Sequence, residues 1–217
     1  MPEHSWFEID EPDELTETER AFVTALREQT ADFASDDTGG EVTWCEDRLV
    51  AYLTVIDPEA PLSLIDFGVH FSGDRVQGDR LHNQLLTLPD QPSGWALDET
   101  GTVQELARRS TRWFHAMLRR PVMLYVWLHN GYAYAARYVL ADTDETISQC
   151  YNDHLAPPGQ AEELIAAGHV HGKNWIQTVG LPVPDLYLHI RGNLDEAAMK
   201  NSRAATKRGP ITGVWYE

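Results

Sequence analysis

Residues 122–140 read VMLYVWLHNGYAYAARYVL, and this stretch decides the expected fold. Two runs rich in β-branched and aromatic residues, Val122–His129 and Tyr132–Leu140, flank the dipeptide Asn130–Gly131. A two-residue type I′ turn needs a positive φ at both of its positions, and Asn followed by Gly meets that need at little cost. The stretch therefore predicts a tight antiparallel β-hairpin.

Further strands are expected on both sides of this hairpin. Upstream, the runs Val42–Glu46 and Leu49–Ile56 are separated by two residues only. In residues 65–71 apolar side chains occupy every second position, as they do in a half-buried strand. Weaker strand patterns follow the hairpin at residues 147–152, 174–179 and 186–191. Because strands and helices do not alternate regularly, the pattern favours an antiparallel sheet.

Two long amphipathic helices are also expected, and each begins with a capping box. Thr16 with Glu19 opens a helix of about residues 16–34, and Thr102 with Glu105 opens one of about residues 102–119. A shorter helix is indicated at residues 159–167. The expected fold class is α+β, with a mainly antiparallel sheet and the two long helices packed on one face of it.

The length of the chain limits the number of domains. A chain of 217 residues, 42% of them hydrophobic, can bury one core, so we expect a single α+β domain over residues 1–191. Residues 192–217 are small and polar up to an aromatic end, which indicates a C-terminal tail that is either mobile or docking. If the tail docks on a neighbouring copy, Trp215 and Tyr216 are the candidate contact residues and the protein forms a homo-oligomer.

The expected compartment is the cytoplasm. The sequence has no run of about 20 apolar residues, and its N-terminal stretch is acidic, whereas a secretory signal is basic and then apolar. Cys45 and Cys150 are too few for a disulfide framework or a four-cysteine zinc site, so reduced thiols are expected. We therefore expect a soluble protein that does not contact membranes.

Charge is distributed unevenly along the chain. Residues 1–60 hold 17 acidic and 3 basic side chains, whereas residues 100–137 hold one acidic side chain and six arginines. An acidic surface repels phosphate backbones, which argues against binding to DNA or RNA, and attracts cationic proteins. The expected partner is a basic protein, with these candidate binding residues: Asp10, Glu11, Asp13, Glu14, Asp36 and Asp37.

The common catalytic motifs are missing from the sequence: it has no phosphate-binding P-loop, no dinucleotide-binding glycine pattern, no hydrolase nucleophile elbow and no zinc-protease helix motif. One weaker pattern remains. His169 and His171 lie one residue apart, so on an extended segment both side chains point to the same side and could bind one divalent metal ion such as zinc. A third ligand would have to come from His189, His154 or Asp153.

Three functional hypotheses follow from these patterns. The first is a non-enzymatic, cofactor-free protein-binding module, for example an immunity or inhibitor protein that neutralises a basic partner, since complementary charge accelerates association. The second is a small metal-dependent or acid–base enzyme that uses His169 and His171. The third is a structural or assembly subunit that docks through its C-terminal tail.

Overall fold

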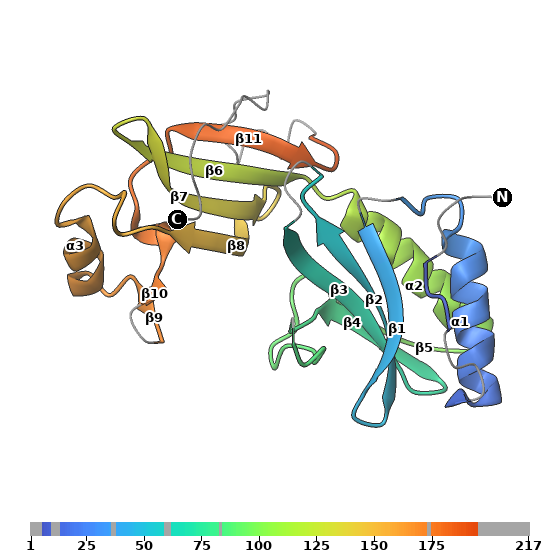
Figure 1. The fold of residues 1–217 in the computed structure, drawn as a ribbon. Coiled ribbons are helices and arrows are strands. Elements are labelled where there is room, and N and C mark those ends of the chain that lie inside the picture. Colours follow the sequence, from blue (N-terminus) through green and yellow to red (C-terminus); the bar gives the residue numbers. More distant parts are fainter. Residues whose placement is uncertain are drawn as a thin grey trace. The chain divides into compact units, whose positions relative to one another are not determined.

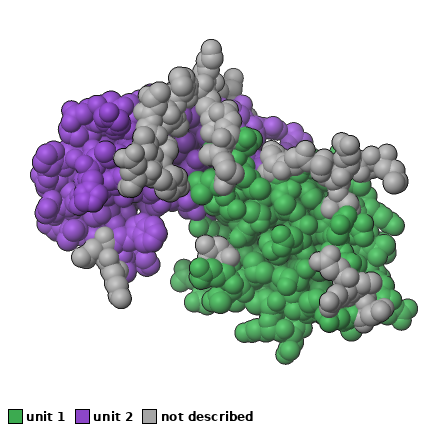
Figure 2. Space-filling model, in the orientation of Figure 1, with its two compact units in different colours: residues 1–118 green, residues 119–217 purple. Residues whose placement is uncertain are grey.

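A computed structural model of the chain describes residues 6–9, 14–35, 38–58, 62–82, 84–172 and 175–194. It divides into two compact units, residues 1–118 (unit 1) and residues 119–217 (unit 2), which Figure 2 colours separately. The boundary between them falls inside the single domain that we expected over residues 1–191. Each unit has its own sheet.

Unit 1 combines two helices with one five-stranded antiparallel sheet, in which the strands follow one another in sequence order (Figure 1). Its elements are α1 (Glu17–Thr30), β1 (Thr38–Cys45), β2 (Arg48–Ile56), β3 (Ser63–Phe71), β4 (Arg75–Arg80), β5 (Leu97–Thr100) and α2 (Val103–Leu118). The pairing of β1 with β2 and of β2 with β3 agrees with the strands expected from the sequence. The short strand β5, which reads LDET, was not expected because these residues have little preference for strands.

Both long helices begin as the sequence predicts. Thr16 accepts a hydrogen bond from the backbone N–H of Glu19, whose carboxylate accepts one from the backbone N–H of Thr16 in return. Thr102 and Glu105 form the same reciprocal pair in front of α2. Each capping box therefore satisfies one N–H group of the first helical turn, and the two helices run side by side in Figure 1.

The core of unit 1 is built around aromatic side chains. Phe22 of α1 stacks on Phe71 of β3 with ring centroids 4.2 Å apart. Trp113 of α2 and Phe67, which lies four residues before Phe71 in β3, pack edge to face with ring centroids 6.2 Å apart. Both phenylalanines of β3 are almost completely buried, so this side of the strand lies inside the core.

Unit 2 holds a four-stranded antiparallel sheet in the order β11-β6-β7-β8, together with a short two-stranded ribbon of β9 and β10. Its elements are β6 (Val122–His129), β7 (Tyr132–Leu140), β8 (Glu145–Tyr151), α3 (Gln160–Ala166), β9 (Val170–His171), β10 (Trp175–Ile176), a 3-10 turn η2 (Thr178–Gly180) and β11 (Leu186–Arg191). The α+β class with mainly antiparallel sheet is therefore confirmed, although the strands form separate sheets in the two units.

The β6–β7 hairpin has the bounds that the sequence predicts. Asn130 and Gly131 form its turn with φ values of 52° and 85°, both in the left-handed region. Beyond the turn, the pairing shifts by one residue between Leu128 and Trp127, so that Trp127 lies opposite Ala135. This β-bulge changes which residues of β7 share a face with the aromatic residues of β6.

The expected C-terminal tail is described only at its start. The backbone N–H of Asn193 donates to the carbonyl of Arg119 at 2.9 Å, which ties residue 193 to the beginning of unit 2. Trp215 and Tyr216 lie outside the described residues, so the docking hypothesis stays a prediction. No helix within the described ranges has the length and apolar character needed to cross a membrane.

Replacing Gly131 with alanine is expected to destabilise unit 2. At a φ of 85° an L side chain is strained, so Gly131→Ala should lower the free energy of unfolding by about 1 kcal/mol in a urea titration followed by circular dichroism. Gly94→Ala is the control, since a Cβ there meets open space and the backbone is not left-handed. Equal stabilities of the two variants would contradict the assigned turn.

Residues 1–118 are expected to fold without unit 2, because their helices, sheet and aromatic core all lie within that range. The expressed fragment should have a cooperative thermal transition and a mixed α/β circular dichroism spectrum. A fragment that stays unfolded, while the full chain melts in a single step, would instead support the single domain that the sequence led us to expect.

Candidate functional site

Most of the acidic residues proposed for partner binding are not among the residues that the structure describes: Asp10, Glu11, Asp13, Asp36 and Asp37. Glu14 is described, and it is exposed just ahead of α1. The binding role of this set therefore stays a prediction. The described part of unit 1 nevertheless contains an acidic site, on the sheet itself.

The histidine pair lies on a small hairpin after α3. His169 is half-buried. Its backbone N–H donates a hydrogen bond to the carbonyl of Leu164, and its carbonyl accepts one from the backbone N–H of Gln177. His171 is exposed and lies opposite Trp175 in the β9–β10 ribbon. Within the described residues no group of three or more His, Cys, Asp or Glu side chains could hold a metal ion. The proposed zinc-like site thus stays a prediction.

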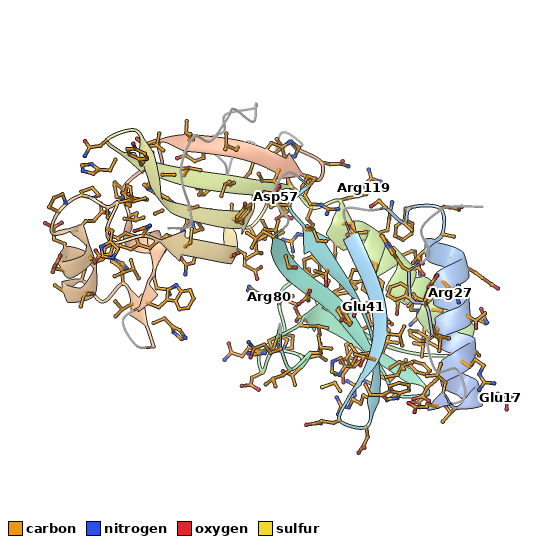
Figure 3. All side chains as sticks on the ribbon, viewed as in Figure 1. Glu17, Arg27, Glu41, Asp57, Arg80 and Arg119 are labelled. Carbon is orange, nitrogen blue, oxygen red and sulfur yellow. The ribbon has the colours of Figure 1, made fainter. Side chains whose placement is uncertain are left out.

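A cluster of polar side chains lies on three neighbouring strands of unit 1, and we call it the acidic patch: Glu41, Tyr52, Thr54 and Asp66. The register places Glu41 of β1 opposite Tyr52 of β2, and Thr54 of β2 opposite Asp66 of β3. The Tyr52 hydroxyl donates a hydrogen bond to the Glu41 carboxylate, and the Thr54 hydroxyl donates one to Asp66 at 2.7 Å. Figure 3 labels Glu41 on β1.

Burial and neighbouring negative charge both act on the titratable groups of the patch. Burial raises the pKa of Asp66, and the negative charge of Glu41 raises it further, against the opposing effect of the Thr54 hydrogen bond. Burial also raises the pKa of Tyr52 well above its ordinary value, with additional contributions from Glu41 and Asp66, so its hydroxyl stays a hydrogen-bond donor. Two carboxylates are thus held near each other by neutral hydroxyl groups.

His70 lies on the same face of β3 as Asp66, as the alternation predicts, but it is not part of this patch. Its ring is buried, and its Nε2 lies 2.7 Å from the carbonyl oxygen of Leu86. Burial lowers the pKa of His70, so the ring is neutral at pH 7. His70 therefore contacts the backbone of Leu86 and does not take part in the hydroxyl–carboxylate hydrogen bonds of the patch.

The sequence indicated Asp66 only indirectly, and it did not indicate the proximity of Asp66 to Glu41. The alternation in residues 65–71 places Asp66 on the polar face of its strand, but nothing local connects it to Glu41, which lies before the first expected strand. The patch forms through the register of β1, β2 and β3, and this register depends on pairings between distant residues. The one available signal was the short connection expected at Asp47–Arg48, which the structure places one residue earlier, at Glu46–Asp47.

Comparison of the chain with models of protein families, with curated proteins and with solved structures found no match.

The substitution Asp66→Asn is expected to stabilise the protein at pH 7. The pKa of Asp66 is raised in the folded state, so its carboxyl group favours folding when protonated and this contribution is lost as the pH rises above the ordinary carboxyl range. Asparagine can still accept the Thr54 hydrogen bond. The thermal midpoint of the variant should exceed that of the wild type at pH 7, and the difference should shrink towards pH 4. A lower midpoint at pH 7 would contradict the assigned pKa shift.

Proposed function

We propose that the protein is a non-enzymatic, cytoplasmic binding protein whose unit 1 binds a basic protein partner through its acidic surface. An immunity or inhibitor protein that neutralises a basic toxin or nuclease is the concrete form of this proposal. Such a protein needs a rigid, strongly charged surface, because complementary charge accelerates encounter and selects the partner.

The observation that carries the proposal is the division of charge between the two units. Residues 1–118 hold 24 acidic and 8 basic side chains, a net charge of −16, whereas residues 119–217 hold 10 acidic and 9 basic side chains, a net charge of −1. Nearly all of the chain's net charge of −17 therefore belongs to unit 1. Acidity needed only for solubility would have no reason to be confined to one unit.

The hairpin of β1 and β2 offers the partner a compact target. Glu41 on β1 and the turn residues Glu46 and Asp47 are all exposed. Trp44, between them in the sequence, keeps 38% of its surface exposed, which is unusual for this residue. Trp44 points to the opposite face of β1 from Glu41 and precedes the acidic turn, so the hairpin presents both a tryptophan and carboxylates, the two residue types that give a protein interface its central affinity and its electrostatic steering.

We further propose that α1 and α2 both cover the face of the sheet opposite the acidic patch. The rings that contact the helices, Phe67 and Phe71, occupy positions of β3 that alternate with Asp66. In this arrangement the helices leave the patch accessible. The cost of holding Asp66 charged in a half-buried position also favours a binding role, since surfaces that bind cations commonly trade stability for function.

Neutralising the acids of the β1–β2 hairpin is expected to abolish partner binding. The triple variant Glu41→Gln, Glu46→Gln, Asp47→Asn should fail to retain, at about 0.05 M salt, a basic partner that the wild type captures from its host in stoichiometric amount. The wild-type complex should dissociate at about 0.3 M salt, since charges on the surface are screened. The measurement is capture of the partner followed by mass spectrometry and quantification of both chains.

The matched control neutralises three exposed acids of unit 2: Asp153→Asn, Glu162→Gln and Glu163→Gln. This variant has the same net charge as the first and should retain the partner. Equal loss in both variants would show that only the total charge matters, and a complex that resists raised salt would contradict an electrostatic interface.

A further inference from the structure

Unit 2 contains a pocket of about 250 Å³ that none of the functions considered so far uses. Its floor is formed by side chains of the sheet, chiefly Tyr125, Trp127 and Arg137, with Asp144 from the turn that follows β7. Its wall is formed by residues 178–184, including Val179 and Val183. The pocket therefore combines one cation, aromatic rings and an apolar rim within a single unit.

Arg137 is a buried cation with too few acceptors. Only 11% of its side chain is exposed, and its guanidinium carbon lies over the rings of Tyr125 and Trp127, at 5.3 and 5.9 Å from their centroids. Its Nε is buried and has no hydrogen-bond partner among the described residues. A desolvated guanidinium whose N–H groups are incompletely satisfied gains much from an anion that accepts them.

Asp144 neutralises this cation only in part. The nearest distance between its carboxylate and the Arg137 guanidinium is 4.0 Å, the limit of an ion pair, and 57% of the Asp144 side chain is exposed to solvent. The same carboxylate also accepts a hydrogen bond from the Tyr125 hydroxyl at 3.3 Å. Burial and the charge of Asp144 raise the pKa of Tyr125 to about 12, so this hydroxyl stays a donor at neutral pH.

The wall of the pocket is fixed in place by hydrogen bonds to the sheet. Trp127 Nε1 donates to the carbonyl of Pro182 at 2.7 Å, and the backbone N–H of Leu128 donates to the Asp185 carboxylate at 2.6 Å. At the other end, the backbone N–H and the hydroxyl of Thr178 donate to Gln149 at 3.0 and 2.7 Å. Since both ends are anchored, the pocket exists before any ligand binds.

The rim of the pocket is apolar although it faces solvent. Val179 and Val183 expose 65% and 61% of their surfaces, while the prolines between and beside them restrict the backbone. Two exposed valines over a buried arginine form a surface that accepts an apolar group at the mouth and a negative charge at the floor.

We propose that this pocket binds a small monocarboxylate with an apolar body. The carboxylate accepts hydrogen bonds from the guanidinium of Arg137, and the apolar body packs against Val179 and Val183. A single negative charge matches the site, because one cation with Asp144 beside it suits a monoanion better than a phosphate dianion, and a planar guanidinium matches a planar carboxylate. The small volume limits the ligand to about the size of one amino-acid side chain with its acid group.

Phenylacetate is the probe that tests this proposal on the full-length protein. Isothermal titration calorimetry should give saturable binding of one phenylacetate per chain, with phenylacetamide, which has the same shape but no charge, at least about tenfold weaker. Inorganic phosphate should bind more weakly than phenylacetate. Equal affinity for the acid and the amide, tighter binding of phosphate, or no saturable binding of phenylacetate would each overturn the proposal.

Variants locate the binding. Arg137→Gln should lower the affinity for phenylacetate by at least about tenfold. Val183→Asp, at an exposed position where folding is not at risk, should also lower this affinity, because it places a like charge at the mouth of the pocket. Arg112→Gln is the control, since Arg112 is an exposed arginine of α2 in unit 1, and it should bind as the wild type does. Unchanged affinity in Val183→Asp, or equal weakening in Arg112→Gln, would place the binding elsewhere.

Discussion

The alternation of side chains along β3 is the constraint on which unit 1 depends. Successive residues of a strand point to opposite faces, so β3 has to supply the helix-side core on one face and the acidic patch on the other. Phe67 and Phe71 contact Trp113 and Phe22 of the helices, and Asp66 consequently lies on the other face, beside Thr54 of β2. A slip of one residue would turn the acid towards the helices and the rings away from them. The aromatic packing that holds the helices thus also determines where the acidic patch lies.

In unit 2 the corresponding constraint is the β6–β7 hairpin, where the turn sets a register that the bulge then changes. Counted from the Asn130–Gly131 turn, an unbroken ladder would place Tyr125 opposite Ala136, and Arg137 would lie on the opposite face. The bulge adds one residue to β7, so that Tyr125 lies opposite Arg137. One irregular position therefore places the Arg137 guanidinium over the rings of Tyr125 and Trp127. β-Bulges are often found near functional sites, where they redirect a side chain in this way.

Features that depend on neighbouring residues could be predicted from the sequence, and features that depend on distant pairings could not. The hairpin bounds, the two capping boxes and strand β11 follow from signals within a few residues, and each agrees with the structure. The division into two sheets does not follow from such signals, because the order of strands depends on pairings between distant residues. The candidate sites were missed for the same reason: Glu41 meets Tyr52 through the β1–β2 register, and Arg137 meets Tyr125 through a bulge that no dipeptide announces.

The carboxylates of the two sites differ from those of Asp98 and Asp142 in what holds them. Asp98 is paired with Arg75 at 2.6 Å and Asp142 with Arg120 at 2.8 Å, so each of these charges is neutralised within the fold. Glu41 is held by the hydroxyl of Tyr52, and Asp144 by that of Tyr125, with only a long contact to Arg137. A protonated tyrosine hydroxyl orients a carboxylate but leaves its charge in place. The fold thus fixes the positions of Glu41 and Asp144 through tyrosine hydroxyl groups, whereas it places Asp98 and Asp142 against arginines.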